Sequence, residues 1–426
     1  MKNTILSLTL LLFTAGLVQA QKGEPAQAPA TPVYALNANV DKVTYTTFQE
    51  DDQTGRSKTF SKSFSADQSD KINLSNRFGS IVIKVWDRRE VKADVQITAY
   101  SNNDSDAQKL LDEVNIDAAK SGDQINFSTK IEDNRGNWGS GTRNGRKWRR
   151  EVRVNYVVYM PASNALNVSQ QYGNVTMGDF SGPVNAKVQY GNFKAGNLSS
   201  ASTNLSVQYG NTDVLQMNRA TIKQQYGSGL TIGTVGTLNL SAQYAKTDIK
   251  TVTGEAVIKQ QYGDGLTLGT VGQLTLNAQY TKVRIQSVKR NTNAIRIQYG
   301  GLEIGTIDNL DLSAQYTGVS IGNLAGDCNL NVQYNNLNVQ RVTEACKRLI
   351  VDAQYVKVAL NFSDNYNANV DVQTSYAAFT HGNTVAARQV GSDEDDSSTK
   401  IYSGKIGNGS SNYVKVKSAY GSVTFQ

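Results

Sequence analysis

The stretch that decides the fold is IKQQYGSGLTIGTVGTLNLSAQY at residues 222–244, which is nearly repeated as IKQQYGDGLTLGTVGQLTLNAQY at residues 258–280. Each copy contains the dipeptide Gln-Tyr twice. The spacing of this dipeptide is 17 to 19 residues until a last interval of 21, and its tyrosines are Tyr172, Tyr190, Tyr209, Tyr226, Tyr244, Tyr262, Tyr280, Tyr299, Tyr316, Tyr334 and Tyr355. So short a period, with alternating apolar residues and glycine corners, is typical of a solenoid whose units bury their inner faces against their neighbours.

Residues 238–244 show how one unit is built, because apolar and polar residues alternate strictly. Leu238 and Ala242 share one face of the expected strand, and Gln243 lies on the other. The glutamines are therefore expected to point outward and to hydrogen-bond from unit to unit as an amide ladder. Tyr244 is in phase with the buried residues, so we expect the tyrosines to complete the core as a ring stack. The alternative is an exposed aromatic platform for sugars or bases.

The spacing of the positively charged residues decides whether one coil contains 18 or 36 residues. The outward position three residues before each tyrosine is occupied by Ser169, Lys187, Ser206, Lys223, Ser241, Lys259, Asn277, Arg296 and Ser313. Coils of 36 residues would stack the cations about 4.8 Å apart, whereas coils of 18 residues separate them to about 9.6 Å with a neutral residue between. We therefore predict an all-β, right-handed parallel β-helix with about 18 residues per coil.

The first 57 residues are expected to comprise a targeting signal and a linker. Residues 1–20 contain Lys2, an apolar run and Val18-Gln19-Ala20, as in a secretory signal peptide. No cysteine follows this cleavage site and no later apolar run approaches the length of a membrane span, so we expect an exported protein, periplasmic or extracellular, that is neither a lipoprotein nor membrane-spanning. Residues 21–57 are expected to form a polar entry segment or linker.

Three further regions are expected. Residues 58–161 form a β-rich N-terminal cap with a helix at 105–114, capped by Asp104 or Ser105, and a basic loop at 134–150. Residues 162–360 are the solenoid repeats, and residues 361–426 are irregular C-terminal coils and a cap. Residues 76–83 echo the repeat with Phe78 in the tyrosine position, which places an atypical first unit inside the N-terminal cap.

The basic loop is a candidate binding site. The chain carries 43 Lys and Arg against 36 Asp and Glu, a net charge of +7. Cations and an aromatic residue concentrate in the loop, and together they can bind polyanions; the candidate residues are Arg143, Arg146, Lys147, Trp148, Arg149 and Arg150. For an exported protein the partner would be an anionic glycan, lipopolysaccharide or extracellular DNA. The alternative is a solvated hairpin tip.

The only two cysteines, Cys328 and Cys346, each lie twelve residues after a repeat tyrosine. Equivalent positions on adjacent coils are close enough for a disulfide, and an exported protein meets an oxidising compartment, so we predict a bond between them. The long interval before Tyr355 leaves an alternative: if its extra residues precede Cys346, Cys328 becomes a buried free thiol.

Several patterns together resemble a known family. NRFGSIVIKVWD at 76–87, the helical DAQKLLDEV at 106–114, VNYVVYMP at 154–161 and the run of QYG-type coils are similar to the bacterial exported putative-adhesin β-solenoid family, a domain family of unknown function. The resemblance implies a β-solenoid located in the cell envelope and an adhesin-like scaffold. It implies no catalytic or ligand-binding residues.

The predicted function is therefore a non-enzymatic, exported, adhesin-like scaffold that presents a repetitive surface to an envelope protein or glycan. The alternative is a polyanion-binding envelope protein that uses the basic loop, and a more distant one is a β-helix carbohydrate-active enzyme. The acidic residues are scattered over different positions of the repeats and His381 is the only histidine, so we predict no catalytic residues, no metal and no cofactor.

Overall fold

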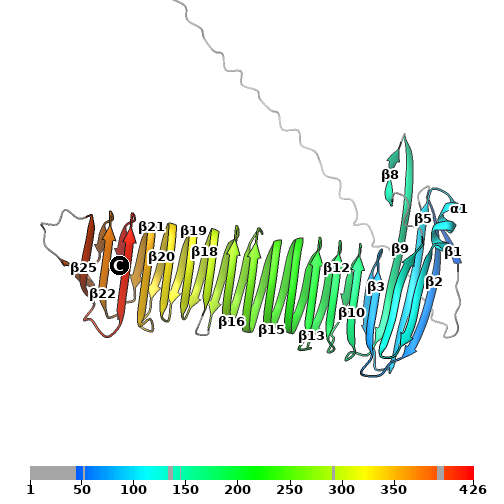
Figure 1. Cartoon of the computed structure of the whole chain (residues 1–426), viewed down its shortest axis with the longest axis horizontal. Coiled ribbons are helices and arrows are strands. Elements are labelled where there is room, and N and C mark those ends of the chain that lie inside the picture. The colour runs from blue at the N-terminus through cyan, green and yellow to red at the C-terminus, as the bar shows by residue number, and fades with distance from the viewer. Residues whose placement is uncertain (1–44, 51–52, 133–137, 144, 290–292, 391–397) are drawn as a thin grey trace, which may run out of the picture. The chain divides into compact units, whose positions relative to one another are not determined.

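The structure, a computed structural model, is built almost entirely of β-strands (Figure 1). It describes residues 45–50, 53–132, 138–143, 145–289, 293–390 and 398–426, which fall within one compact unit of the chain. The expected signal peptide, 1–20, lies outside the described residues, as does most of the expected entry segment. The described part of that segment begins the antiparallel pair β1 (Tyr45–Glu50) and β2 (Gln53–Ser65) rather than a linker.

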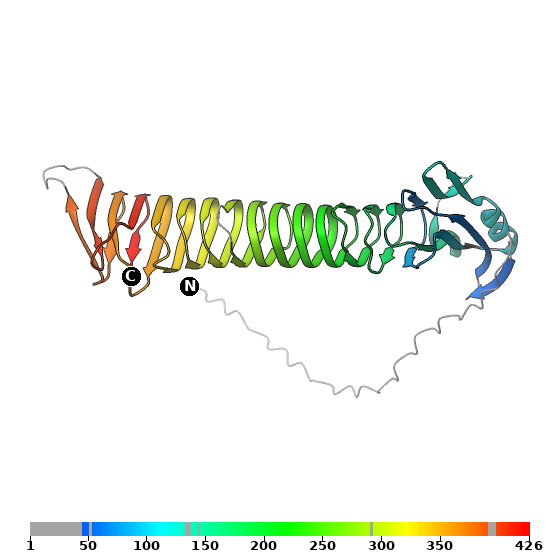
Figure 2. The same cartoon turned by 90° about the horizontal axis from the view of Figure 1, so that it is seen from below.

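Parallel pairing joins each repeat to the next (Figure 2). In the first ladder, Leu166 pairs with Val184 and Val184 pairs with Thr203, so the glutamines before the tyrosines align. This ladder contains β10 (Ala165–Gln171), β12 (Val184–Gln189), β14 (Thr203–Gln208), β15 (Thr212–Gln261), β16 (Leu266–Gln279), β18 (Ala294–Ile307), β19 (Leu310–Leu324), β20 (Cys328–Val342) and β21 (Arg348–Phe362). A second ladder pairs β11 (Val175–Met177) with β13 (Phe193–Leu198) and β16 with β17 (Lys282–Val288).

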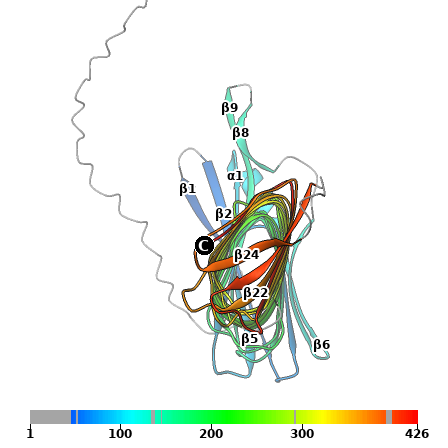
Figure 3. The same ribbon diagram turned by 90° about the vertical axis from the view of Figure 1, so that its left-hand side faces the viewer.

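The core lies between these ladders. Leu238, Leu240 and Ala242 are each only 1% exposed, as their alternation predicts. In the view along the repeats, successive turns of the chain superimpose (Figure 3). Each turn therefore buries its apolar side chains against those of the neighbouring turns, and the buried residues form continuous columns.

The N-terminal region supplies the first turn of this stack. β3 (Lys71–Asn76) pairs with β10, and β4 (Ile81–Val85) pairs with β11, which confirms the echo of the repeat at residues 76–83. The surrounding strands are β5 (Glu90–Ser101), β6 (Val114–Ser121), β7 (Gln124–Ile131), β8 (Gly139–Arg143) and β9 (Arg146–Met160). The expected helix is α1 (Asp104–Asp112). Its predicted cap, Asp104 or Ser105, is wrong: the N-cap is Asn103, whose side chain accepts a hydrogen bond from the Asp106 amide.

The C-terminal segment is inserted into the stack out of sequence order. β26 (Tyr413–Ala419) and β27 (Val423–Phe425) pair with β21 on one side. On the other side they pair with β22 (Ala368–Ser375) and β23 (Phe379–His381), which precede them in the chain. β25 (Thr399–Ile406) joins β22 to β24 (Val385–Val390) by antiparallel pairing. The last strands of the chain therefore complete the ladder.

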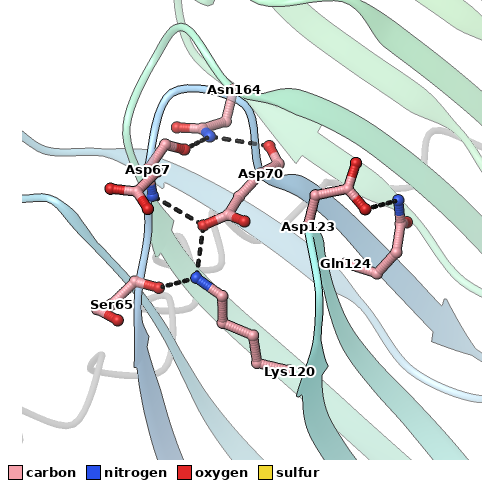
Figure 4. A network of polar contacts seen from close by, with 7 residues as sticks. All are labelled: Ser65, Asp67, Asp70, Lys120, Asp123, Gln124 and Asn164. Atoms are coloured by element: carbon pink, nitrogen blue, oxygen red, sulfur yellow. Dashed lines mark hydrogen bonds and ion pairs between the residues drawn. The ribbon is translucent and has the colours of Figure 1, made fainter.

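A buried polar network joins the first turn to the repeats (Figure 4). The Asp70 carboxylate accepts hydrogen bonds of 2.7 Å from the Lys120 ammonium and the Asp67 amide. Asn164, which is 1% exposed, donates to the backbone carbonyls of Asp67 and Asp70. Burial by itself would raise the pKa of Asp70, but the hydrogen bond from Lys120 and that from the Asp67 amide outweigh it, so the pKa is lowered.

Asp70→Asn is expected to reduce the free energy of unfolding by about 2 kcal/mol at neutral pH, because the variant leaves Lys120 without its carboxylate. The folded-state pKa of Asp70 lies below the unfolded value of about 3.9, so this contribution is present above that value and is lost as the pH falls through the folded-state pKa. Urea titrations at pH 7 and in acid measure both effects. Asp123→Asn is the control, since Asp123 is half exposed and its ion pair with Lys71 contributes little; equal losses at pH 7 would contradict the assignment.

Candidate binding surface

The tyrosines form a continuous stack of nearly parallel rings along one corner of the repeats. From Tyr172 to Tyr355, neighbouring ring centroids are 4.5 to 5.2 Å apart and neighbouring planes differ by at most 12°. Tyr420 and then Tyr376 continue the stack, because β26 lies between β21 and β22. At the other end Phe78 stacks on Tyr172 at 5.5 Å.

The expectation that these rings complete the core is wrong. The repeat tyrosines are 37% to 48% exposed, whereas the aliphatic residues before them are buried. Each of these tyrosines has a φ between 50° and 56°, the left-handed region. This conformation turns the chain at the tyrosine and ends the strand alternation, so the ring leaves the buried phase and lies outside the corner.

The glycine that follows several of the tyrosines allows neighbouring backbones to approach closely, whereas the left-handed turn is made by the tyrosine. A Cβ atom on Gly191 would lie 1.9 Å from the carbonyl oxygen of Gly173 in the preceding repeat. At Gly191 the corner therefore needs glycine for close approach of the stacked backbones, although other repeats have Ala245, Thr281 or Val356 at this place. The tyrosine adopts the left-handed conformation at a cost of about 1–2 kcal/mol. Ring stacking offsets this cost, since aromatic pairs contribute about 0.5–1.5 kcal/mol each beyond their buried area.

Stacking decides which part of each ring meets solvent. The two faces of a ring inside the stack lie against its neighbours, so the edges and hydroxyl groups are exposed. The pKa of Tyr316 is raised by loss of hydration and by the neighbouring phenols of Tyr334 and Tyr299. Sugars and bases need a free ring face for stacking. The corner therefore offers a row of phenol hydroxyls rather than an aromatic platform.

The predicted glutamine ladder is confirmed beside the tyrosines. Side-chain amides donate to the amide oxygen of the next repeat at 2.8 to 3.4 Å, for example from Gln261 to Gln279 and from Gln279 to Gln298. A second glutamine escaped the sequence analysis. Where the sequence has Gln-Gln-Tyr, the first glutamine is buried and holds the preceding corner: Gln224 donates to the Gly210 carbonyl at 2.6 Å. The doubled glutamine in Gln-Gln-Tyr is the sequence signal from which this buried residue could have been predicted.

The outward residues one, three and five positions before each tyrosine, from Tyr172 to Tyr299, form a surface that we call the amide face. Asn, Gln, Ser and Thr predominate there. Two shallow cavities lie on or beside it. One, of about 240 Å³, is lined by Asn277, Gln279 and Arg296 among others, and one of about 420 Å³ by Asn167, Asn185 and Lys187 among others. The face thus offers hydrogen-bond donors and acceptors in repeated columns.

The basic loop is a β-hairpin formed by β8 and the start of β9. The Arg149 guanidinium lies 3.8 Å from the centroid of the Tyr100 ring and 2.7 Å from the Glu151 carboxylate. The Arg150 guanidinium is 3.7 Å from the Glu113 carboxylate and packs over a tryptophan ring, that of Trp138.

The remaining candidates in the hairpin differ in exposure. Trp148 is half-buried, Lys147 is exposed, and the side chains of Arg143 and Arg146 lie outside the described residues. Two of the six predicted polyanion-binding residues, Arg149 and Arg150, are therefore engaged with carboxylates and rings of the protein itself.

The predicted disulfide is not formed in this structure. Cys328 and Cys346 are both buried free thiols. The register pairs Cys328 with Leu349, because the three extra residues of the long interval precede β21. Burial raises the pKa of Cys346 to about 12 and raises that of Cys328 as well. The alternative expectation, a buried free thiol at Cys328, is confirmed.

Within the described ranges, no group of three or more His, Cys, Asp or Glu could hold a metal ion. His381 is exposed at the end of β23, and the four acidic residues 393–396 lie outside the described residues. None of the helices in the part of the chain that is described is long and apolar enough to cross a membrane.

Tyr244→Ala should reduce the free energy of unfolding by about 1–2 kcal/mol, because it removes two stacking contacts and keeps the left-handed strain. Tyr244→Gly should cost about 1 kcal/mol less than Tyr244→Ala, since glycine adopts the same φ without strain. Chemical denaturation measures both. A loss above about 3 kcal/mol in the alanine variant would indicate a buried ring, and equal losses in the two variants would contradict the left-handed corner.

Arg149→Gln should lower the melting temperature, since it removes the ion pair with Glu151 and the cation–π contact with Tyr100, together about 1–2 kcal/mol. Lys147→Gln, an exposed change of the same charge in the same hairpin, should leave the melting temperature within about 1 °C. Differential scanning calorimetry compares the two. Equal melting temperatures would show that Arg149 is not part of the folded framework.

No family model and no curated protein matches the chain. A structure from Clostridium sporogenes, described as a putative cell adhesion protein, is 8% identical over 87% of this chain and 98% of its own, with a TM-score of 0.15. Putative adhesins from Parabacteroides distasonis and Parabacteroides merdae are 14% and 11% identical over 72% of this chain and 92% of theirs, with TM-scores of 0.18 and 0.20. These structures are described in the same terms as the family in the resemblance drawn from the sequence.

Proposed function

We propose that this chain is a non-enzymatic, exported, adhesin-like scaffold of the bacterial envelope that presents a repeated surface to a glycan or protein. In this proposal the repeats form a right-handed solenoid with one coil per tyrosine. The parallel register of 17 to 19 residues between most paired strands supports that coil length. The signal-like residues 1–20 support export.

The observation that carries the proposal is the amide face beside the tyrosine hydroxyls. Its polar groups recur at the same position in successive repeats instead of converging on one place, as the groups of a catalytic centre would. Amides and phenols donate and accept hydrogen bonds, and a polymer of sugars offers hydroxyl groups in an equally regular order. A linear glycan can therefore contact many repeats at once, so that weak single contacts add up.

The full mature chain should be retained on at least one polysaccharide of a panel or on an envelope extract, measured by biolayer interferometry. Gln208→Ala, Gln225→Ala, Gln243→Ala and Gln261→Ala combined should weaken that binding by about tenfold or more, since several hydrogen bonds are lost. The control combines Thr267→Ala, Gln286→Ala, Ser320→Ala and Asn338→Ala on the second ladder and should change binding by less than about twofold. Equal loss in both variants, or no retention of the parent, would refute the proposal.

A further inference from the structure

A row of four cations runs along the amide face. Lys187, Lys223, Lys259 and Arg296 each lie three residues before a tyrosine. The register places a neutral residue between them, because Ser206 pairs with both Lys187 and Lys223, and Asn277 pairs with both Lys259 and Arg296. Strands in a sheet are about 4.8 Å apart, so neighbouring cations of the row are about 9.6 Å apart. The row is thus a regular array with a two-repeat period.

Nothing on the amide face neutralises this row. All four side chains are exposed, and within the described ranges none of them forms an ion pair. From Tyr172 to Tyr299 the three columns of the face contain no Asp or Glu, and the next repeat brings one carboxylate, that of Asp311, beside the end of the row at Arg296. The second ladder is different, since Lys194 lies 3.6 Å from Asp213 and Arg284 lies 2.8 Å from Glu303 of the next repeat. Positive potential is therefore available to a ligand along the amide face, whereas these two cations of the second ladder are neutralised by carboxylates.

The cations at the two ends of the row also line the two cavities already described. Lys187 borders the larger cavity with Asn167 and Asn185, and Arg296 borders the smaller one with Asn277 and Gln298. Each hollow therefore combines one cation with several amide groups. Such a combination can bind an anionic group and the hydroxyls beside it at the same time.

We propose that the amide face binds a linear acidic polysaccharide that carries an anionic group on alternate sugars, which deepens the proposed scaffold function and rests on it. A period of about 9.6 Å exceeds the length of one sugar ring and is close to that of a two-sugar repeat. The amide columns then contact the hydroxyls between the anionic groups. Nucleic acid fits less well, because the stacked tyrosines cover each other's faces and leave none for bases.

The test compares three forms of the full mature chain for binding to hyaluronan, which carries a carboxylate on alternate sugars, to neutral dextran and to single-stranded poly(dT). One form combines Lys187→Gln, Lys223→Gln, Lys259→Gln and Arg296→Gln. The control form makes the same change of charge off the amide face, with Lys246→Gln, Lys250→Gln, Lys282→Gln and Lys289→Gln. All eight residues are exposed, and equal melting temperatures will confirm that the variants fold.

The parent chain should bind hyaluronan with an affinity that falls as salt is raised. The row variant should lose at least about tenfold in affinity and most of its salt dependence, and the control form should lose less than about twofold. Unchanged binding in the row variant, equal binding of dextran, or tighter binding of poly(dT) through the row would each overturn this inference. Dextran or envelope retention alone would still leave the scaffold function standing, whereas retention on no polymer and no extract would remove both.

Discussion

In-register parallel pairing between successive repeats holds this molecule together, and it also decides what the surface presents. Each strand of the stack hydrogen-bonds to the strand before it and to the strand after it. A residue at a given place in one repeat therefore lies directly above the same place in the next. Burial, stacking and charge are therefore properties of columns rather than of single residues. A single substitution changes the contacts of its two neighbours in the column.

The tyrosine column shows how such a constraint changes the energetics of one residue. A tyrosine in the left-handed conformation is unfavourable by itself. In a column each ring packs on two others, so the favourable stacking is shared along the whole corner, from Phe78 to Tyr376. The glutamine column beside it uses the same geometry with hydrogen bonds. On this account the tyrosine and glutamine columns stabilise the fold, and the solvent-facing polar groups of the amide face can contact other molecules.

The two ends of the stack also have to be covered, because the unpaired edge of a terminal strand can pair with other chains. At the N-terminal side β3 and β4 pair with the first repeat but are themselves paired with β7 and β9. At the C-terminal side the last strands of the chain are inserted between β21 and β22. Because β26 follows β22 by about forty residues, this part of the ladder closes only when the end of the chain is in place.

The sequence by itself determined the repeat, the parallel β-architecture, the buried aliphatic positions and the outward glutamines, because the two-residue period of a strand is written in the order of the side chains. It also located the helix and the place of Phe78 in the stack. It could not place the tyrosines, since the alternation that puts Tyr244 in the buried phase ends at a left-handed φ that only the corner reveals. The sequence could not place Cys328 either, because its partner depends on where the three extra residues of the long interval lie, which only the register shows. Nor could it place Arg149, because its contacts with Tyr100 and Glu151 depend on how separate strands pack. The order of neighbouring residues determines the periodicity. Only the stacking of the repeats decides which columns face solvent and which cations are paired.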